Sequence, residues 1–199
     1  MKNLRPGTLQ NTGLIILLVI SGSMNAVLAH QIKAQRQIVE RIRAEGRLQA
    51  GTLVPAITGK TPQGEQTTID FAAPGHPTVL YVFSPTCGWC KRNLENMMTL
   101  RREIGSHYAF VGVSLTSTGL TEYVSQNKLD YPVVADIPDS VKAAYKMGGT
   151  PSTIVVSPDN KVLKVWSGAY QGTSLQEIEN YFQVKLPGLT PQEKLQAGQ

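Results

Sequence analysis

One uninterrupted apolar and β-branched run, TVLYVFS at residues 78–84, constrains the fold of this chain most strongly. A strand that is apolar at every position must be covered on both faces, as in the interior of an α/β sheet. The only two cysteines, Cys87 and Cys90, follow it and open the helix-like segment at residues 88–105. The pattern therefore predicts a central strand whose carboxyl end leads through both cysteines into a helix.

Strands and helices are expected to alternate through residues 51–184. The further expected strands are 56–58, 67–69, 108–115, 131–136, 151–158 and 161–168, and the further helices 120–129, 139–147 and 174–182. Asp159-Asn160 suits a tight turn between the last two strands. This order predicts one α/β domain with a central mixed sheet flanked by helices on both faces. Residues 185–199 are polar and marked by Pro and Gly, so we expect a flexible tail.

Residues 1–29 are predicted to be a signal peptide or a membrane anchor. The apolar run LIILLVI at 14–20 follows two basic residues, and Val27-Leu28-Ala29 offers small residues for signal cleavage. Residues 12–29 also give about 18 positions, near the lower limit for crossing a bilayer. We favour the anchor because the segment stays apolar beyond Ser23. Residues 30–50 then predict a solvated helical spacer, since their apolar stripe is thin.

Charge restricts the partners more than it identifies them. The net charge is +5, of which residues 31–50 contribute +3, and basic residues interleaved with aromatic ones are missing, so we expect no nucleic-acid partner. Five Lys and Arg residues follow the apolar segment by residue 47, against two before it. That bias alone favours a domain on the cytoplasmic side.

The cysteine pair suits disulfide exchange. Cys87 is expected at a helix N-terminus, where unpaired amides carry about half a positive charge and lower a thiol pKa. Lys91, one turn further along, is expected to lower this pKa as well. Cys90 lies one turn deeper, so the outer thiolate can attack a disulfide and the inner thiol can resolve the mixed disulfide. Gly88-Trp89 between them would tune the potential.

Two other uses of the cysteines are less favoured. A structural zinc site needs four ligands, and only His30, His76 and His107 could join the two thiols. A purely structural disulfide over so short a loop would stabilise the fold little. A second feature favours exchange: GGTPST at residues 148–153 places Pro151 at the start of a strand, where a cis bond after Thr150 would free that backbone to pair with a substrate.

YVFSPTCGWC and YPVVAD…VKAAYKMGGTPSTIVVSPDNKVL, in this order, resemble thioredoxin-fold redoxins, most closely the membrane-tethered TlpA/ResA-like or AhpC/TSA-type proteins, over about residues 51–184. The resemblance implies a thioredoxin-like sheet, Cys87 as attacking thiol, Cys90 as resolving thiol and Pro151 as a cis-proline facing them. Thr150 and Trp89 would border the groove for the partner.

The resemblance also implies a cellular location and a class of partners. Its anchored members usually work outside the cytoplasm and often reduce disulfides of partner proteins, and this outweighs the charge bias in our expectation. The partners would be protein thiols and disulfides, a membrane-bound electron donor, and the membrane itself through the N-terminal segment. We expect neither a cofactor nor a metal. We expect a reductant rather than an oxidant.

The chain departs from the family patterns at several positions. Tethered reductases often carry Glu-x-Pro after the second cysteine, where this chain has Asn93 and Glu95. The peroxidase pattern Pro-x-x-x-Thr-x-x-Cys is replaced by Leu80 and Ser84 before Cys87, which argues against peroxidase activity. The alternative from a different class is a thiol-based copper chaperone with Met97 and Met98 as soft ligands, although a Met pair inside a helix usually belongs to the core.

Overall fold

The computed structural model describes the backbone of residues 6–191 and, inside the first helix, the side chains of residues 16–39. The chain divides into two compact units, Met1–Arg47 and Leu48–Gln199, and each is described by itself.

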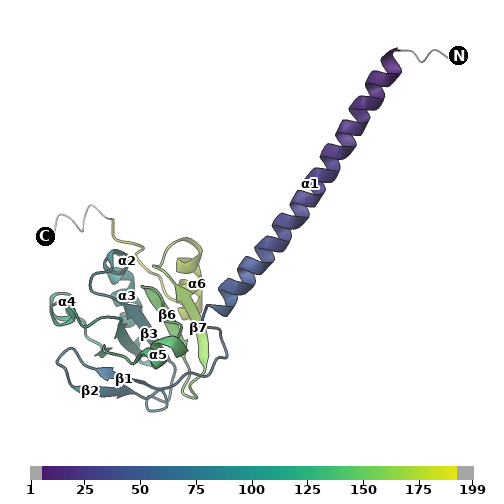
Figure 1. The fold of residues 1–199 in the computed structure, drawn as a ribbon. Helices are drawn as coiled ribbons and strands as arrows, with labels where there is room; N and C mark the ends of the chain where they lie inside the picture. Colours follow the sequence, from purple (N-terminus) through teal and green to yellow (C-terminus); the bar gives the residue numbers. More distant parts are fainter. Residues whose placement is uncertain (1–5, 192–199) are drawn as a thin grey trace. The chain divides into compact units, whose positions relative to one another are not determined.

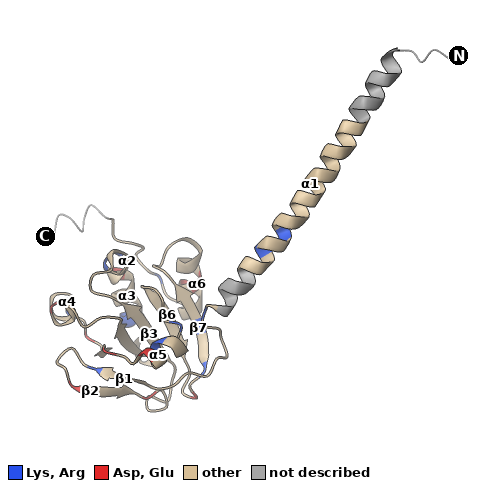
Figure 2. Ribbon diagram, viewed as in Figure 1, with Lys and Arg blue, Asp and Glu red and all other residues tan. Residues whose placement is uncertain are grey.

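Helix α1, Pro6–Glu45, is the first unit's only described element (Figure 1). From residue 6 to residue 45 the predicted anchor and the predicted spacer form one helix, with no break at residue 29. Its described side chains are exposed, and the apolar 24-residue stretch Ile16–Val39 is long enough to cross a bilayer, a criterion that a signal sequence would also meet. In this stretch the charged residues are Lys33 and Arg36, near its carboxyl end (Figure 2). Lys2 and Arg5 lie outside the described residues.

The second unit is built on a five-stranded mixed sheet of order β5-β4-β3-β6-β7. Its strands are β3 Thr78–Phe83, β4 Ala109–Ser114, β5 Val133–Val134, β6 Ser152–Val156 and β7 Val162–Ser167. Strand β3 is central, parallel to β4 and antiparallel to β6. Every residue of β3 is buried, as the apolar run predicts. A separate hairpin pairs β1 Ile57–Lys60 with β2 Gln66–Ile69.

Helices cover both faces of this sheet, which confirms the predicted layers. They are α2 Gly88–Arg92, α3 Leu94–Ile104, the short 3₁₀ helix η1 Gly105–His107, α4 Leu120–Gln126, α5 Asp139–Ala144 and α6 Gly172–Phe182. Tyr81 and Phe83 of β3 pack in one core with residues of α3, α4 and α6, whereas Leu80 and Val82 pack in the other with α5 and β1. Successive strand residues point to opposite faces, so one strand supplies both cores.

Two elements differ from the predicted bounds. The helix expected over residues 88–105 is divided at Asn93, whose φ of −89° and ψ of −2° end α2 and begin α3. Strand β5 has two residues where six were expected. The next residue, Ala135, exchanges two backbone hydrogen bonds of 2.8 Å with Lys60 of β1. The segment thus leaves the main sheet to pair with the hairpin.

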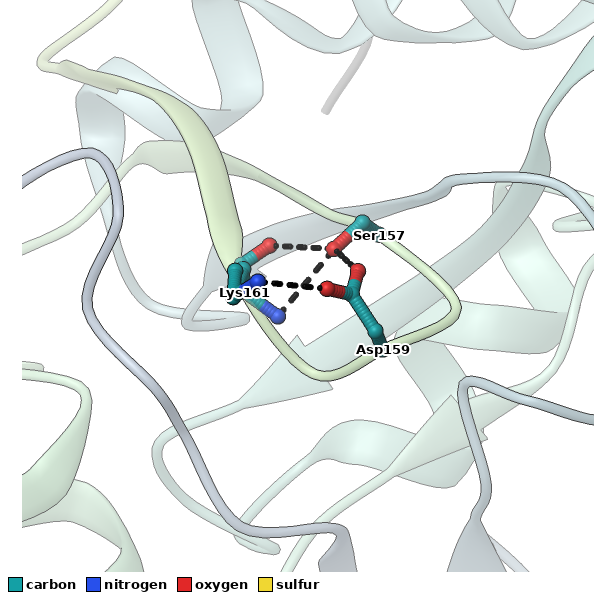
Figure 3. Close-up of polar contacts among 3 residues, drawn as sticks. All are labelled: Ser157, Asp159 and Lys161. Atoms are coloured by element: carbon teal, nitrogen blue, oxygen red, sulfur yellow. Dashed lines mark hydrogen bonds and ion pairs between the residues drawn. The ribbon is translucent and has the colours of Figure 1, made fainter.

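The predicted turn between β6 and β7 is present. Asn160 adopts a φ of 60°, and Lys161 Nζ lies 2.9 Å from the Asp159 carboxylate (Figure 3). The Ser157 hydroxyl contacts the same carboxylate and accepts a hydrogen bond from the Lys161 amide at 3.1 Å. The hydrogen bond from the Ser157 hydroxyl, followed by that from the Lys161 side chain, holds the pKa of the Asp159 carboxyl below its ordinary value.

The segment expected to be a flexible tail begins with a hydrogen-bonded stretch, residues 186–190. The Leu186 amide donates to Glu179 of α6, and the Gly188 amide donates to Asn96 of α3 at 2.8 Å. Residues 192–199, the rest of that prediction, lie outside the described residues.

Candidate active site

Cys87 occupies the N-cap of α2, directly beyond the carboxyl end of β3. Its backbone is extended, with a φ of −77° and a ψ of 114°. Its sulfur accepts a hydrogen bond from the Cys90 amide at 3.2 Å. The side chain of an N-cap residue satisfies amides of the first helical turn, a role for which oxygen is the usual acceptor. Here a sulfur takes this place, so the local fold aims amide hydrogens at Cys87.

The two thiols have different environments. Both are free; Cys87 is half-buried, whereas Cys90 is fully buried and packs in the core with Tyr81 and Met97. A partner molecule can therefore reach the outer sulfur but not the inner one. One turn of helix thus carries a half-buried outer thiol and a buried inner thiol.

The pKa values of the pair are driven apart. Burial raises the pKa of Cys87, but the hydrogen bonds of the Cys90 and Thr150 side chains and of the Cys90 and Trp89 amides outweigh it, so the pKa lies below its ordinary value. Burial raises the pKa of Cys90 to about 12, and the hydrogen bond with Cys87 adds to this increase. The thiolate of Cys87 therefore forms at a lower pH than that of Cys90.

Thr150 and Pro151 lie against Cys87, although they are more than 60 residues away in sequence. The Cys87 sulfur is 3.6 Å from the Thr150 carbonyl oxygen, and the Thr150–Pro151 peptide bond is cis. The β6 strand, which begins at Ser152, pairs antiparallel with β3. This pairing places the Gly-Gly-Thr-Pro turn beside the carboxyl end of β3, where Cys87 follows.

The side chains of Trp89 and Lys91 have other surroundings than the Cys87 sulfur. Trp89 is 47% exposed, and the Arg92 guanidinium lies 4.6 Å from the centre of its ring. The largest contributions that lower the pKa of Cys87 come from Cys90, Thr150 and Trp89, and a contribution of Lys91 stays a prediction. Lys91 lines a cavity of about 360 Å³ between α2 and α4, together with Pro85, Thr86, Leu94, Thr118, Gly119, Glu122, Tyr123, Gln126 and Asn127.

Asn93 and Asn96 form a buried polar pair behind the cysteines that the sequence interpretation missed. The Asn96 side-chain amide donates to the Asn93 side-chain oxygen at 3.0 Å, and the Asn93 side-chain amide donates to the Tyr81 hydroxyl at 3.2 Å. The available signal was their spacing of three residues, which places two amides on the inner face of the helix next to Met97. Met97 is buried in the core, and Met98 packs against that core, as expected for a Met pair inside a helix.

This topology, with a Cys-x-x-Cys helix starting beyond the central strand and a cis-proline beside the outer sulfur, defines a thioredoxin-fold protein with a dithiol site. Residues 50–165, more than half of the chain, match the AhpC/TSA family. The chain belongs to this family.

Known proteins support the assignment of the fold. A thiol-disulfide oxidoreductase ResA from Oceanobacillus iheyensis is 27% identical over 121 residues, which cover 59% of this chain and 62% of the relative. The thioredoxin domain of a Bacteroides vulgatus thiol-disulfide oxidoreductase superposes with a TM-score of 0.55 and 22% identity, over 68% of this chain and 99% of that one. A thiol:disulfide interchange protein DsbE from Chlorobium tepidum superposes with a TM-score of 0.57 and 17% identity. The match covers 68% of this chain and 98% of that one.

Proposed function

We propose that this chain is a membrane-anchored, extracytoplasmic thiol–disulfide oxidoreductase that uses Cys87 and Cys90 to reduce disulfides of partner proteins. The observation that carries the proposal is the opposite shift of two pKa values within one helical turn, lowered at Cys87 and raised at Cys90. Perturbed thiols of this kind suit a two-step exchange in which one sulfur attacks and the other waits.

In the first step the Cys87 thiolate attacks one sulfur of the partner disulfide. A Cys87–partner disulfide forms, the partner's S–S bond breaks, and its second sulfur leaves as a thiolate that takes a proton from solvent. The Cys87 sulfur is half-buried, and its amide contacts hold it at the helix end while the partner approaches. Thr150 and the half-exposed Trp89 are proposed to border the bound polypeptide.

In the second step Cys90 resolves the mixed disulfide. Burial is the main reason for its high pKa, but the thiol of Cys87 also contributes, and that contribution ends once Cys87 is covalently bound. Cys90 then loses its proton to water, and its thiolate attacks the Cys87 sulfur. The partner sulfur that was bound to Cys87 leaves as a thiolate and takes a proton from solvent. Two electrons pass to the partner, and a Cys87–Cys90 disulfide remains. A dithiol donor protein at the membrane returns the two electrons.

Three features support the setting. Helix α1 has the length and composition of a membrane span, a relative carries the name ResA, and the dithiol belongs to a family domain that begins only a few residues beyond α1. Labelling Cys87 in intact cells with a membrane-impermeant maleimide tests the side of the membrane. Labelling only after lysis would place the domain in the cytoplasm, as the excess of Lys and Arg after the span favours.

Trapping tests the reaction. In Cys90→Ser the second step is blocked, so partner proteins should accumulate as disulfides on Cys87 and dissociate with dithiothreitol. The matched control Cys87→Ser should trap none, because Cys90 is buried. The redox potential of the Cys87–Cys90 couple, measured by equilibration with glutathione, tests the direction of electron flow. A value below about −200 mV supports a reductant, whereas one near −120 mV indicates an oxidant. Equal trapping by both variants would contradict the proposed division of roles.

A further inference from the structure

Residues 186–190, hereafter the C-terminal strap, are bound to the helix that carries the cysteines. Arg92 Nε donates to the Thr190 carbonyl oxygen at 3.2 Å, and the Thr190 amide donates to the Arg92 carbonyl oxygen at 2.9 Å. Both the side chain and the backbone of Arg92 are therefore paired with a single residue of the strap. Thr190 lies 98 residues further along the chain, so only the tertiary structure creates this contact.

Arg92 also contacts the redox motif. Its guanidinium lies 4.6 Å from the centre of the Trp89 ring, three residues earlier on α2. The same side chain thus touches the strap through Nε and the indole through its cationic group. A free arginine side chain would occupy several rotamers, and the hydrogen bond to Thr190 restricts them.

The strap is held at two further points. The Gly188 amide donates to Asn96 at 2.8 Å, and the Leu186 amide donates to the Glu179 carboxylate at 3.0 Å. Asn96 in turn donates to Asn93, at the junction between α2 and α3. These contacts keep the strap in register with Arg92, because Gly188 is only two residues before Thr190.

We propose that Arg92 is a positioning residue for partner docking: the C-terminal strap fixes its guanidinium over Trp89, and this holds the indole in the orientation that a partner polypeptide meets beside Cys87. The inference rests on the proposed function, since docking has meaning only for an exchanging protein. Trp89 is 47% exposed and lies between the two cysteines in sequence, so a polypeptide that reaches Cys87 meets this ring. An indole already in place loses less conformational entropy on binding than a mobile one.

The experiment compares Arg92→Gln with the matched control Arg102→Gln in the full chain in detergent. Arg102 is an exposed residue of α3, and its Nε lies 3.4 Å from the carboxylate of the neighbouring Glu103. For a disulfide-bonded polypeptide such as insulin, KM should rise about two- to five-fold in Arg92→Gln, with a smaller change in kcat. A small aromatic disulfide should be affected less. Acrylamide quenching of tryptophan fluorescence should increase in Arg92→Gln, because the Trp89 ring loses the guanidinium that lies over it. The change reports on Trp89, since Trp166 is buried.

Two truncations test the strap itself. A chain ending at Pro187 loses the Gly188 and Thr190 contacts, whereas one ending at Pro191 keeps them. The shorter chain should reproduce the KM and quenching changes of Arg92→Gln, and adding that substitution to it should change little more. The longer chain and Arg102→Gln should match the wild type.

The outcomes separate the two proposals. A wild-type chain active on both substrates, with Arg92→Gln and the Pro187 truncation unchanged in KM and quenching, overturns the positioning role and leaves the proposed function intact. An equal loss on the polypeptide and on the small disulfide also overturns it, since the effect would then lie at Cys87. A wild-type chain inactive on both substrates overturns the proposed function and this inference with it.

Discussion

The amide nitrogen of Tyr170 donates a hydrogen bond of 2.9 Å to the side-chain oxygen of Asn93, although 77 residues separate them. Asn93 ends the helix that carries the cysteines, and Tyr170 lies between β7 and α6. Both residues are fully buried. Asn93 also binds Tyr81 and Asn96 through its side chain, so one amide connects the end of α2 with β3, α3 and the approach to α6.

Asn93→Ala should lower the free energy of unfolding by about 2–4 kcal/mol. The substitution leaves the Tyr170 amide and the Asn96 side chain without their acceptor inside the protein, and an unsatisfied buried polar group costs about 1–3 kcal/mol. Urea denaturation followed by far-UV circular dichroism measures the loss. Asn180→Ala, at an exposed position of α6, is the matched control and should change stability by less than about 0.5 kcal/mol. Similar losses in both variants would show that the Asn93 network is not stabilising.

Alkylation should separate the two thiols by pH. In Cys90→Ser, the iodoacetamide rate at Cys87 should rise with a midpoint below the ordinary thiol pKa of 9.0, although losing the Cys90 side chain removes one of the stabilising hydrogen bonds. In Cys87→Ser, the buried Cys90 should react slowly up to pH 10, since its pKa lies near 12 when both thiols are present. Mass spectrometry of quenched samples gives both rates. A midpoint at or above 9.0 for Cys87 would contradict its activation.

The reduced protein should lose stability above pH 9 through Cys90. Its folded pKa is raised, so its contribution is complete below the unfolded value of 9.0 and is lost as pH rises toward the folded value of about 12, because the unfolded thiol ionises first. The stability difference between the reduced wild type and Cys90→Ser, from urea denaturation at pH 8.0 and 10.5, should therefore shrink at the higher pH. Comparing the variants cancels the ionisation of the buried tyrosines, apart from the part that Cys90 itself adds to the pKa of Tyr81 and Tyr123. A constant difference would argue against the raised pKa.

Gly59→Ala should destabilise the domain by about 1–3 kcal/mol. A Cβ atom at residue 59 would lie 2.6 Å from the Val134 side chain and would overlap the Ala135 carbonyl oxygen, so β1 and β5 would have to separate. Gly148→Ala is the matched control, because a Cβ atom there meets no neighbour within 4 Å. Thermal unfolding of both variants is the measurement, and an unchanged midpoint for Gly59→Ala would disprove the tight approach of the hairpin.

A fragment of residues 48–199 should be soluble and keep the fold without α1. Both cores consist of residues from Leu48 onward, and the described side chains of Ile16–Val39 are exposed. The full chain, in contrast, should require detergent because about 24 mostly apolar positions favour a bilayer. Circular dichroism and analytical ultracentrifugation of the fragment test this. An aggregated fragment, or a full chain that is monomeric without detergent, would contradict the division into anchor and domain.

The strongest local patterns were predicted from the sequence, and patterns that depend on distant neighbours were not. The run at residues 78–84 has one reasonable structure, a doubly covered strand, and the structure has it as β3. The end of the helix at Asn93 was not predicted, because the residue is held by Tyr81 and Tyr170 from other parts of the chain. The six-residue estimate for β5 failed for the same kind of reason, since Ala135 pairs with Lys60 of the hairpin.

The sequence by itself determined the chemistry available to this protein: two thiols separated by two residues, after a buried strand, with an apolar segment at the N-terminus. These features depend on local spacing and on composition, which any short window of the chain contains. Only the tertiary structure decided how the thiols differ. It brought Thr150 and a cis-proline to Cys87, buried Cys90 in a core of distant residues, and attached residues 186–190 to Arg92. Burial and hydrogen bonding between segments far apart in sequence require the folded chain, so no local pattern contains them.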